Sequence, residues 1–201
     1  MGRPAVFFGL LEKSAALGAE SIGALRTLTA QPGEPDLEPL RNIRRADKKV
    51  VGELELLLIR VFVTPIERED LEDVANALYR IPKAAEMFGE MYSILWHHIT
   101  TLDLTIALQM LQNASKLIVE MVQTLAAGGS HATVKSLDAR LSQIEADSAA
   151  VINHALGKIY QPGGDPMQEI AAHDIYRALS ECFDTCRTCG RVIALVTLKN
   201  S

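Results

Sequence analysis

The feature that most constrains the fold is the apolar pattern of residues 104–125. Large apolar side chains recur there at alternating intervals of four and three residues, interrupted only by Ser115. The series is Leu104, Leu108, Leu111, Ser115, Ile118, Val122 and Leu125, and Met110, Leu117 and Met121 widen it. This spacing places all of these side chains along one side of an α-helix. We therefore predict a helix that packs through this side in a bundle.

Turn signals divide the rest of the chain into segments of the same kind. Clear signals fall at 29–36, 63–65, 126–131 and 161–166, and a weaker one falls at 97–103. The segments between them are about 25–35 residues long, and none alternates polar and apolar residues as a strand does. The composition agrees, because 48% of residues are apolar but only 5% are aromatic, which favours helix packing over a β-sandwich. We predict an all-α fold of six long helices.

The stretch "FVTPIERED", which starts at Phe62, has the signature of a helix start. Thr64 is placed to cap the helix, Pro65 to occupy its first turn, and Glu67 completes a Thr-x-x-Glu capping box. We therefore expect the third helix to begin at Pro65. Pro82 falls inside this helix, where it removes one backbone hydrogen bond and is expected to bend the axis.

A weak internal repeat divides the chain in two. The sequence "EDLEDVANALYR" at 69–80 aligns without gaps to "HDIYRALSECFD" at 173–184. We interpret this as two three-helix pseudo-repeats, about 1–100 and 101–201, within a single domain that spans the whole chain.

Composition also limits the function classes and the location. The net charge of −5 argues against a nucleic-acid partner, because phosphate contacts require a basic surface. The three cysteines, Cys182, Cys186 and Cys189, fall in one helical segment, where we expect core packing rather than a disulfide framework or a zinc site.

The N-terminal apolar stretch is broken by Glu12 and Lys13, unlike a signal peptide. The longest apolar run is too short to span a bilayer. We expect a soluble, cytoplasmic protein.

No group of residues indicates catalysis. Glu169, His173 and Asp174 are close together on a predicted helix, but no nucleophile accompanies them. The glycine pair in "AAGGSH" lacks the Lys-Ser/Thr ending of a phosphate-binding loop. We therefore predict that the protein is not an enzyme.

Four stretches of the sequence resemble a known family. "FFGLLEKSAALGAESIGAL", "FVTPIERED", "LSQIEAD" and "HDIYRALSECFDTC" are similar to the PhoU-like family of phosphate-transport accessory proteins, in particular the branch associated with low-affinity phosphate permeases. The resemblance implies two pseudo-repeated three-helix bundles. It also implies a non-enzymatic accessory protein or regulator of inorganic phosphate transport that docks to a membrane permease. We expect a homo-oligomer with peripheral contact at the inner face of the membrane.

The resemblance also implies a position for metal ligands, from which this sequence departs. Family members with the full pattern carry acidic-x-x-x-Asp pairs on two helices of each half, which can hold Fe or Zn. In the first half, Tyr79, Arg80 and Lys83 occupy positions expected to be acidic. In the second half, carboxylates lie near the expected positions, so weak Fe or Zn binding is the only cofactor prediction. These residues are Glu145, Asp147, Glu181 and Asp184.

A cluster of cations offers a different site. Five of them recur on the second predicted helix at a spacing that places them on one face, and two more lie on the third helix. They are Arg41, Arg44, Arg45, Lys48, Lys49, Arg80 and Lys83. We hypothesise that they bind an anionic partner: an acidic transporter loop, anionic headgroups or phosphate itself. The alternative is a solvated basic face paired with nearby acids. For the protein as a whole, the alternatives are a metal-binding helical bundle and a helical scaffold without a phosphate role.

Overall fold

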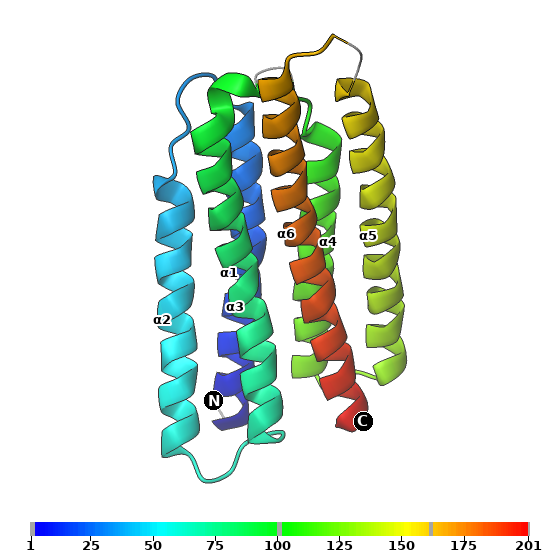
Figure 1. Ribbon diagram of the computed structural model, residues 1–201. Helices are drawn as coiled ribbons and strands as arrows, with labels where there is room; N and C mark the ends of the chain where they lie inside the picture. Colours follow the sequence, from blue (N-terminus) through cyan, green and yellow to red (C-terminus); the bar gives the residue numbers. More distant parts are fainter. Residues whose placement is uncertain (1–2, 100–101, 161–162, 201) are drawn as a thin grey trace.

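The protein is a bundle of long, roughly parallel and antiparallel helices (Figure 1). The computed structural model describes residues 3–99, 102–160 and 163–200, and no strand occurs among them. The helices are α1 (Arg3–Ala30), α2 (Glu38–Arg60), α3 (Arg68–Leu95), the short 3-10 helix η1 (Trp96–His98), α4 (Thr105–Ala126), α5 (His131–Ile159) and α6 (Pro166–Lys199). The predicted all-α fold with six long helices is confirmed. None of the described helices is long and apolar enough to cross a membrane.

The predicted turns fall between the helices. Gly128 ends α4 with a positive φ of 64°, a conformation that glycine adopts without strain. The helices α2 and α4, with 23 and 22 residues, are somewhat shorter than predicted. Parts of two predicted turns, residues 100–101 and 161–162, lie outside the described residues.

The six helices form two three-helix halves. Helices α1, α2 and α3 pack on one another, as do α4, α5 and α6. The halves meet where α1 packs on α4 and α3 packs on α6, whereas α2 and α5 each contact helices of their own half only. Figure 1 shows α2 and α5 on opposite sides of the bundle. Among the described helices, α2 and α5 therefore each leave one side without a helix packed on it.

The predicted apolar side of residues 104–125 forms the centre of the core. All seven members of the 4-3 series are buried. The one polar member, Ser115, satisfies its hydroxyl by donating to the carbonyl oxygen of Gln112 at 2.9 Å. The three cysteines of α6 are buried as well, as predicted for core residues. Burial raises the pKa of the Cys186 thiol to about 12, so this thiol stays protonated at neutral pH.

The start of α3 differs from the prediction. The helix begins at Arg68, three residues later than expected, and its N-cap residue Glu67 makes no side-chain capping bond. Thr64 does not cap the helix, because its hydroxyl donates to a carbonyl oxygen within the link. Arg68 turns back instead, and its guanidinium donates to the carbonyl oxygens of Leu58 and Val61 at the end of α2. Its N–H groups thereby pair with carbonyl oxygens that the end of a helix leaves without a partner.

Asp70 fastens the same end of α3 to α6. Its side chain is fully buried and accepts hydrogen bonds from Lys199 Nζ at 2.7 Å and Asn200 Nδ2 at 3.1 Å. The pKa of Lys199 is raised, chiefly by this hydrogen bond. The segment "FVTPIERED" thus provides contacts that join α2, α3 and α6.

The internal repeat has a different register from the predicted one. Of the eleven buried residues of α3, ten fall on buried residues of α6 when 101 is added to their numbers, but only six when 104 is added. The predicted alignment of 69–80 with 173–184 uses the shift of 104. At the shift of 101, Gly89 matches Gly190, and each glycine faces a leucine of the outer helix, Leu40 and Leu141 respectively. These leucines are also 101 residues apart.

Candidate functional site

The predicted basic face divides between the surface and the interior. Arg41, Arg45, Lys48 and Lys49 on α2 are exposed, as are Arg80 and Lys83 on α3. Arg45 forms an ion pair with Glu38. Arg44 does not belong to this exposed face, because only 14% of its side chain is exposed.

Arg44 points into the interface between α2 and α3. Its guanidinium carbon lies 3.7 Å from the centroid of the Tyr79 ring, a cation–π contact. Its Nε lies 3.8 Å from Glu86 Oε2, a long ion pair. The Nη1 atom is buried without a hydrogen-bond partner among the described residues. The charge is therefore held mainly by an aromatic face and by nearby carboxylates.

Asp47, one turn further along α2, is fully buried between the helices of the first half. Its Oδ1 accepts a hydrogen bond from the Ser14 hydroxyl of α1 at 2.7 Å, whereas Oδ2 has no partner in the described part of the chain. Burial raises the pKa of Asp47, and the Ser14 hydrogen bond and the Arg44 charge oppose this shift. We conclude that this carboxylate has an incomplete set of partners.

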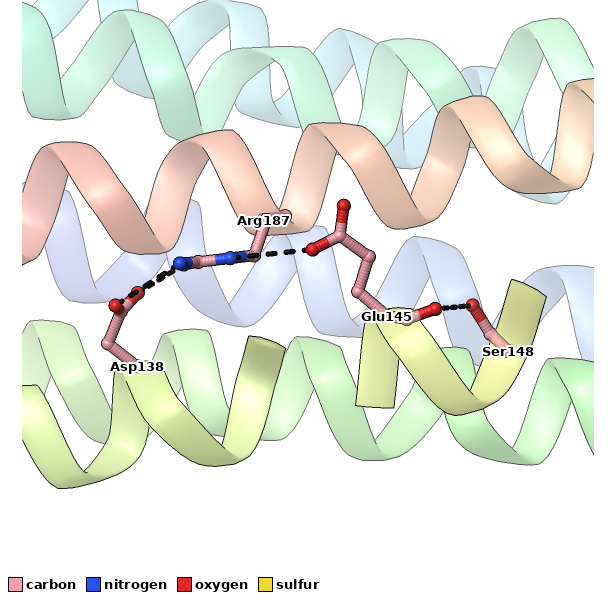
Figure 2. Close-up of polar contacts among 4 residues, drawn as sticks. All are labelled: Asp138, Glu145, Ser148 and Arg187. Atoms are coloured by element: carbon pink, nitrogen blue, oxygen red, sulfur yellow. Dashed lines mark hydrogen bonds and ion pairs between the residues drawn. The ribbon is translucent and has the colours of Figure 1, made fainter. Parts of the chain in front are cut away.

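In the second half, an arginine of α6 lies between two carboxylates of α5 (Figure 2). The guanidinium of Arg187 donates two hydrogen bonds to Asp138, and its Nε lies 3.4 Å from Glu145 Oε2, outside hydrogen-bonding geometry. Only 11% of the Arg187 side chain is exposed. Ser148 donates its hydroxyl to the backbone carbonyl of Glu145 at 2.7 Å. This cation is balanced by two carboxylates.

The two internal arginines are related by the repeat with their charges exchanged. At the shift of 101, Arg44 of α2 matches Glu145 of α5, and Glu86 of α3 matches Arg187 of α6. Each half therefore has one ion pair at the same place, between its outer helix and a helix of the half-to-half contact. In the first half the cation is on the outer helix, and in the second half it is on the inner one.

Three of the four predicted metal residues of the second half have other partners. Glu145 pairs with Arg187, Glu181 with Arg177 across one helical turn, and Asp147 accepts a hydrogen bond from Gln143. Asp184 is exposed. The described residues contain no group of three or more His, Cys, Asp or Glu side chains placed to hold a metal ion. The structure does not bring the predicted set together, and Fe or Zn binding stays a prediction.

Arg80 and Lys83 line a shallow groove where α3 of the first half meets α6 of the second. The groove has a volume of about 490 Å³, and Thr185 and Thr188 contribute its opposite wall. Both cations are exposed, and no ion pair joins either one to another described residue. Cationic groups beside hydroxyl groups are suited to a small oxyanion, although Asp73 also lines the groove.

The sequence interpretation missed the Arg187 site. Asp138 and Glu145 are seven residues apart, so they lie on the same side of α5. That spacing was a usable signal for a paired acidic site. The cation that occupies it comes from a different helix, 42 residues beyond Glu145, and the local pattern contains no sign of it.

Comparisons with known proteins give the fold a name. No protein-family model matches the chain, and no curated protein sequence matches it. Among solved structures, a PhoU-like protein from Shewanella oneidensis MR-1 is 16% identical, with a TM-score of 0.68 over 97% of each chain. A PhoU-like phosphate regulatory protein from the same organism is 14% identical, with a TM-score of 0.64 over 98% of each chain. The chain has the PhoU-like fold.

Proposed function

We propose that this protein is a non-enzymatic regulator of inorganic phosphate transport that acts by docking to a membrane permease. The observation that carries the proposal is the match of fold along almost the whole chain to two PhoU-like proteins, one of them described as a phosphate regulatory protein. The sequence resemblance supports the same assignment. The branch that accompanies low-affinity permeases is the finer part of the proposal.

The exposed cations of α2 are the proposed contact with the permease. No ion pair joins Arg41, Lys48 or Lys49 to another residue in the described part of the chain, so all three are available to an anionic surface. Because α2 packs only on α1 and α3, its outer side is open to a large partner. We assign this side to an acidic cytoplasmic loop of the permease. Regulation then requires that the bundle bind two permease conformations with different affinity.

The groove that contains Arg80 and Lys83 is the proposed place for a small anion such as phosphate. It lies across the contact between the two halves, so an anion bound there would touch both α3 and α6. A bound anion could therefore affect both halves of the bundle.

The proposal is tested by phosphate uptake in cells of the source organism. We expect deletion of the gene to change the rate of uptake of radiolabelled phosphate, and the wild-type gene to restore it. Unchanged uptake across low and high external phosphate would contradict a role in phosphate transport and would favour a helical scaffold.

A matched pair of variants separates the basic side of α2 from general charge effects. The test variant carries Arg41→Glu, Lys48→Glu and Lys49→Glu. The control carries Lys135→Glu, Arg140→Glu and Lys158→Glu on α5, the outer helix of the other half, with the same change in net charge. All six side chains are exposed. We expect only the control to complement the deletion.

A further inference from the structure

The link between α2 and α3 presents an exposed apolar surface at one end of the bundle. Phe62 is 100% exposed and Val63 is 80% exposed, and Ile59 and Leu56 continue the surface along α2 with 78% and 54%. We call these four residues the apolar tip. Exposed apolar side chains scattered singly are ordinary, but four within eight consecutive residues are a concentration typical of an interaction site.

The apolar tip is held in a fixed position. Val61 and Ile66, on either side of Phe62 and Val63, pack against the core. The hydrogen bonds from Arg68 to the end of α2 hold the link from behind. Figure 1 shows this link extending beyond the ends of α1 and α6. These contacts restrain the link, so binding through the tip loses less conformational entropy than binding through a free loop.

A groove between α2 and α3 continues the apolar tip. It has a volume of about 360 Å³, and Leu54, Leu58 and the tip residue Ile59 contribute apolar lining. Glu55 of α2 and Glu72 of α3 contribute one carboxylate from each helix. Arg68 also lines the groove, with its guanidinium bound to carbonyl oxygens. A ligand there would therefore meet apolar surface beside two carboxylates and one guanidinium.

The surroundings of the apolar tip are acidic. Six exposed carboxylates occur close to it in sequence, at the end of α2, in the link and at the start of α3: Glu53, Glu55, Glu67, Glu69, Glu72 and Asp73, the last of which also lines the groove between α3 and α6. The same stretch contains two cations, Arg60 and Arg68, and a third, Lys199 of α6, pairs with Asp70 at the start of α3. The guanidinium of Arg68 is already bound to carbonyl oxygens. We call this set of six carboxylates the acidic rim.

We infer that the apolar tip and its acidic rim bind a Lys/Arg-rich amphipathic segment of a membrane protein, of the kind that adjoins a membrane-spanning helix on its cytoplasmic side. Such segments combine apolar side chains with an excess of Lys and Arg. Their apolar side chains match the tip and groove, and their cations match Glu55 and Glu72. This inference rests on the proposed role beside a permease, and it places a second contact at a different part of α2 from the basic side.

The charge of the rim argues against two other occupants. A bilayer surface with anionic lipids would be repelled by six exposed carboxylates. A second copy of the chain, docked symmetrically through the same surface, would bring one acidic rim against another. A basic segment avoids both conflicts.

A peptide titration tests the inference. The probe is a short fluorescein-labelled peptide of Leu and Lys spaced as an amphipathic helix, and a Leu–Glu peptide with the same spacing is the comparator. Binding is followed by fluorescence anisotropy at physiological salt. We expect the wild-type protein to bind the Lys peptide and not the Glu peptide. We expect Phe62→Ser with Val63→Ser to weaken binding about tenfold or more.

Two matched controls show whether the site is the one inferred. Ile94→Ser with Ile106→Ser removes apolar side chains that are exposed 72% and 63% outside the tip, and should leave the affinity unchanged. Glu55→Gln with Glu72→Gln should weaken binding and reduce its salt dependence, whereas Glu20→Gln with Glu90→Gln should do neither. Equal affinity of the tip variant and its control would overturn the inference, as would failure of the wild-type protein to bind the Lys peptide.

The other occupants are also outcomes of the test. If the tip variant instead abolishes a dimer seen by sedimentation, or flotation with phosphatidylglycerol-containing vesicles, the inferred partner is wrong. The titration does not depend on phosphate uptake. If the wild-type protein does not bind the Lys peptide but does regulate phosphate uptake, this surface alone is refuted. If it binds the peptide but has no effect on phosphate uptake, the proposed role alone is refuted.

Discussion

The two halves of the bundle bury an ion pair at matching positions but satisfy it unequally. In the second half, Arg187 lies between Asp138 and Glu145 and makes two hydrogen bonds to the first. In the first half, Arg44 rests on the Tyr79 ring, and its carboxylate partner Glu86 is 3.8 Å away. The second site is a charge-balanced clamp, whereas the first contains a looser cation.

The comparison shows which features the two halves share and which they do not. Each half has one ion pair between its outer helix and an inner helix, and the two pairs run in opposite directions. The halves do not share the same set of carboxylates, because Asp47 in the first half corresponds to Ser148 in the second. Asp47 has one buried oxygen without a hydrogen-bond partner among the described residues.

The largest expected effect is on the clamp. Arg187→Met leaves Asp138 and Glu145 facing each other without a cation, and we expect it to lower the free energy of unfolding by about 3 kcal/mol. Arg44→Met should lower it by about 1–2 kcal/mol, because Arg44 has a single ion pair, with Glu86 at 3.8 Å, and no hydrogen bond to a carboxylate. Chemical denaturation of the two variants measures the difference. An equal or larger loss for Arg44→Met would contradict the comparison.

Exchanging the charges of the first half tests the repeat directly. Arg44→Glu with Glu86→Arg gives the first half the direction that the second half already has. We expect the loss in free energy of unfolding of the double variant to be about 1–2 kcal/mol smaller than the sum of the losses of the two single variants. Adding Asp47→Ser, the residue found in the second half, should increase its stability further. Additive single effects would mean that the pair is not a unit.

The matched glycines should respond alike in the two halves. An added Cβ would lie 2.5 Å from Leu40 Cδ1 at Gly89 and 2.5 Å from Leu141 Cδ2 at Gly190. Each leucine must shift, and the helix propensity of alanine offsets part of the strain, so we expect a loss of about 1 kcal/mol from either Ala variant. Gly52→Ala, which meets no atom within 4 Å, should be neutral or stabilising. Thermal unfolding of the three variants measures these changes in stability. A loss of stability for only one of Gly89→Ala and Gly190→Ala would contradict the shift of 101 residues between the halves.

The smallest effect is a pH dependence confined to the first half. The pKa of Asp47 is raised in the folded state above its value of 3.8 in the unfolded chain, so protonation favours folding. Its contribution to stability is full below pH 3.8 and is lost as the pH rises through the raised value. Asp47→Asn lacks this titration. We therefore expect its stability relative to the wild type to increase with pH above 3.8 and then level off, as measured by denaturation at each pH.

The sequence predicted the fold well because its signals are local and strong. The 4-3 spacing at 104–125 and the turn residues between helices need no tertiary information. The predicted alignment of the two repeats was wrong by three residues, because local spacing alone does not fix it. A shift of three residues rotates a helix by about 300°, which returns much of the same apolar face, so burial is needed to separate the two alignments.

The interior sites could not be predicted from spacing. Arg44 fits the basic face at i, i+3 and i+4, but it also lies within the inward stripe between Leu40 and Asp47. Its partners Tyr79 and Glu86 belong to another helix, and no local pattern links them to it. Cations such as Lys48 and Lys49 lie on the exposed face that the spacing predicted, because an exposed side chain needs no partner from a distant part of the chain.

The most direct test of the proposed function is crosslinked affinity purification of the protein from solubilised native membranes, with partners identified by mass spectrometry. The wild type and the α5 control variant should both recover a phosphate permease. The variant with Arg41→Glu, Lys48→Glu and Lys49→Glu should not. Arg44 stays unchanged in all of them, because its interior position would confuse loss of docking with loss of fold. Recovery of no phosphate permease by the crosslinked wild type would contradict the proposal.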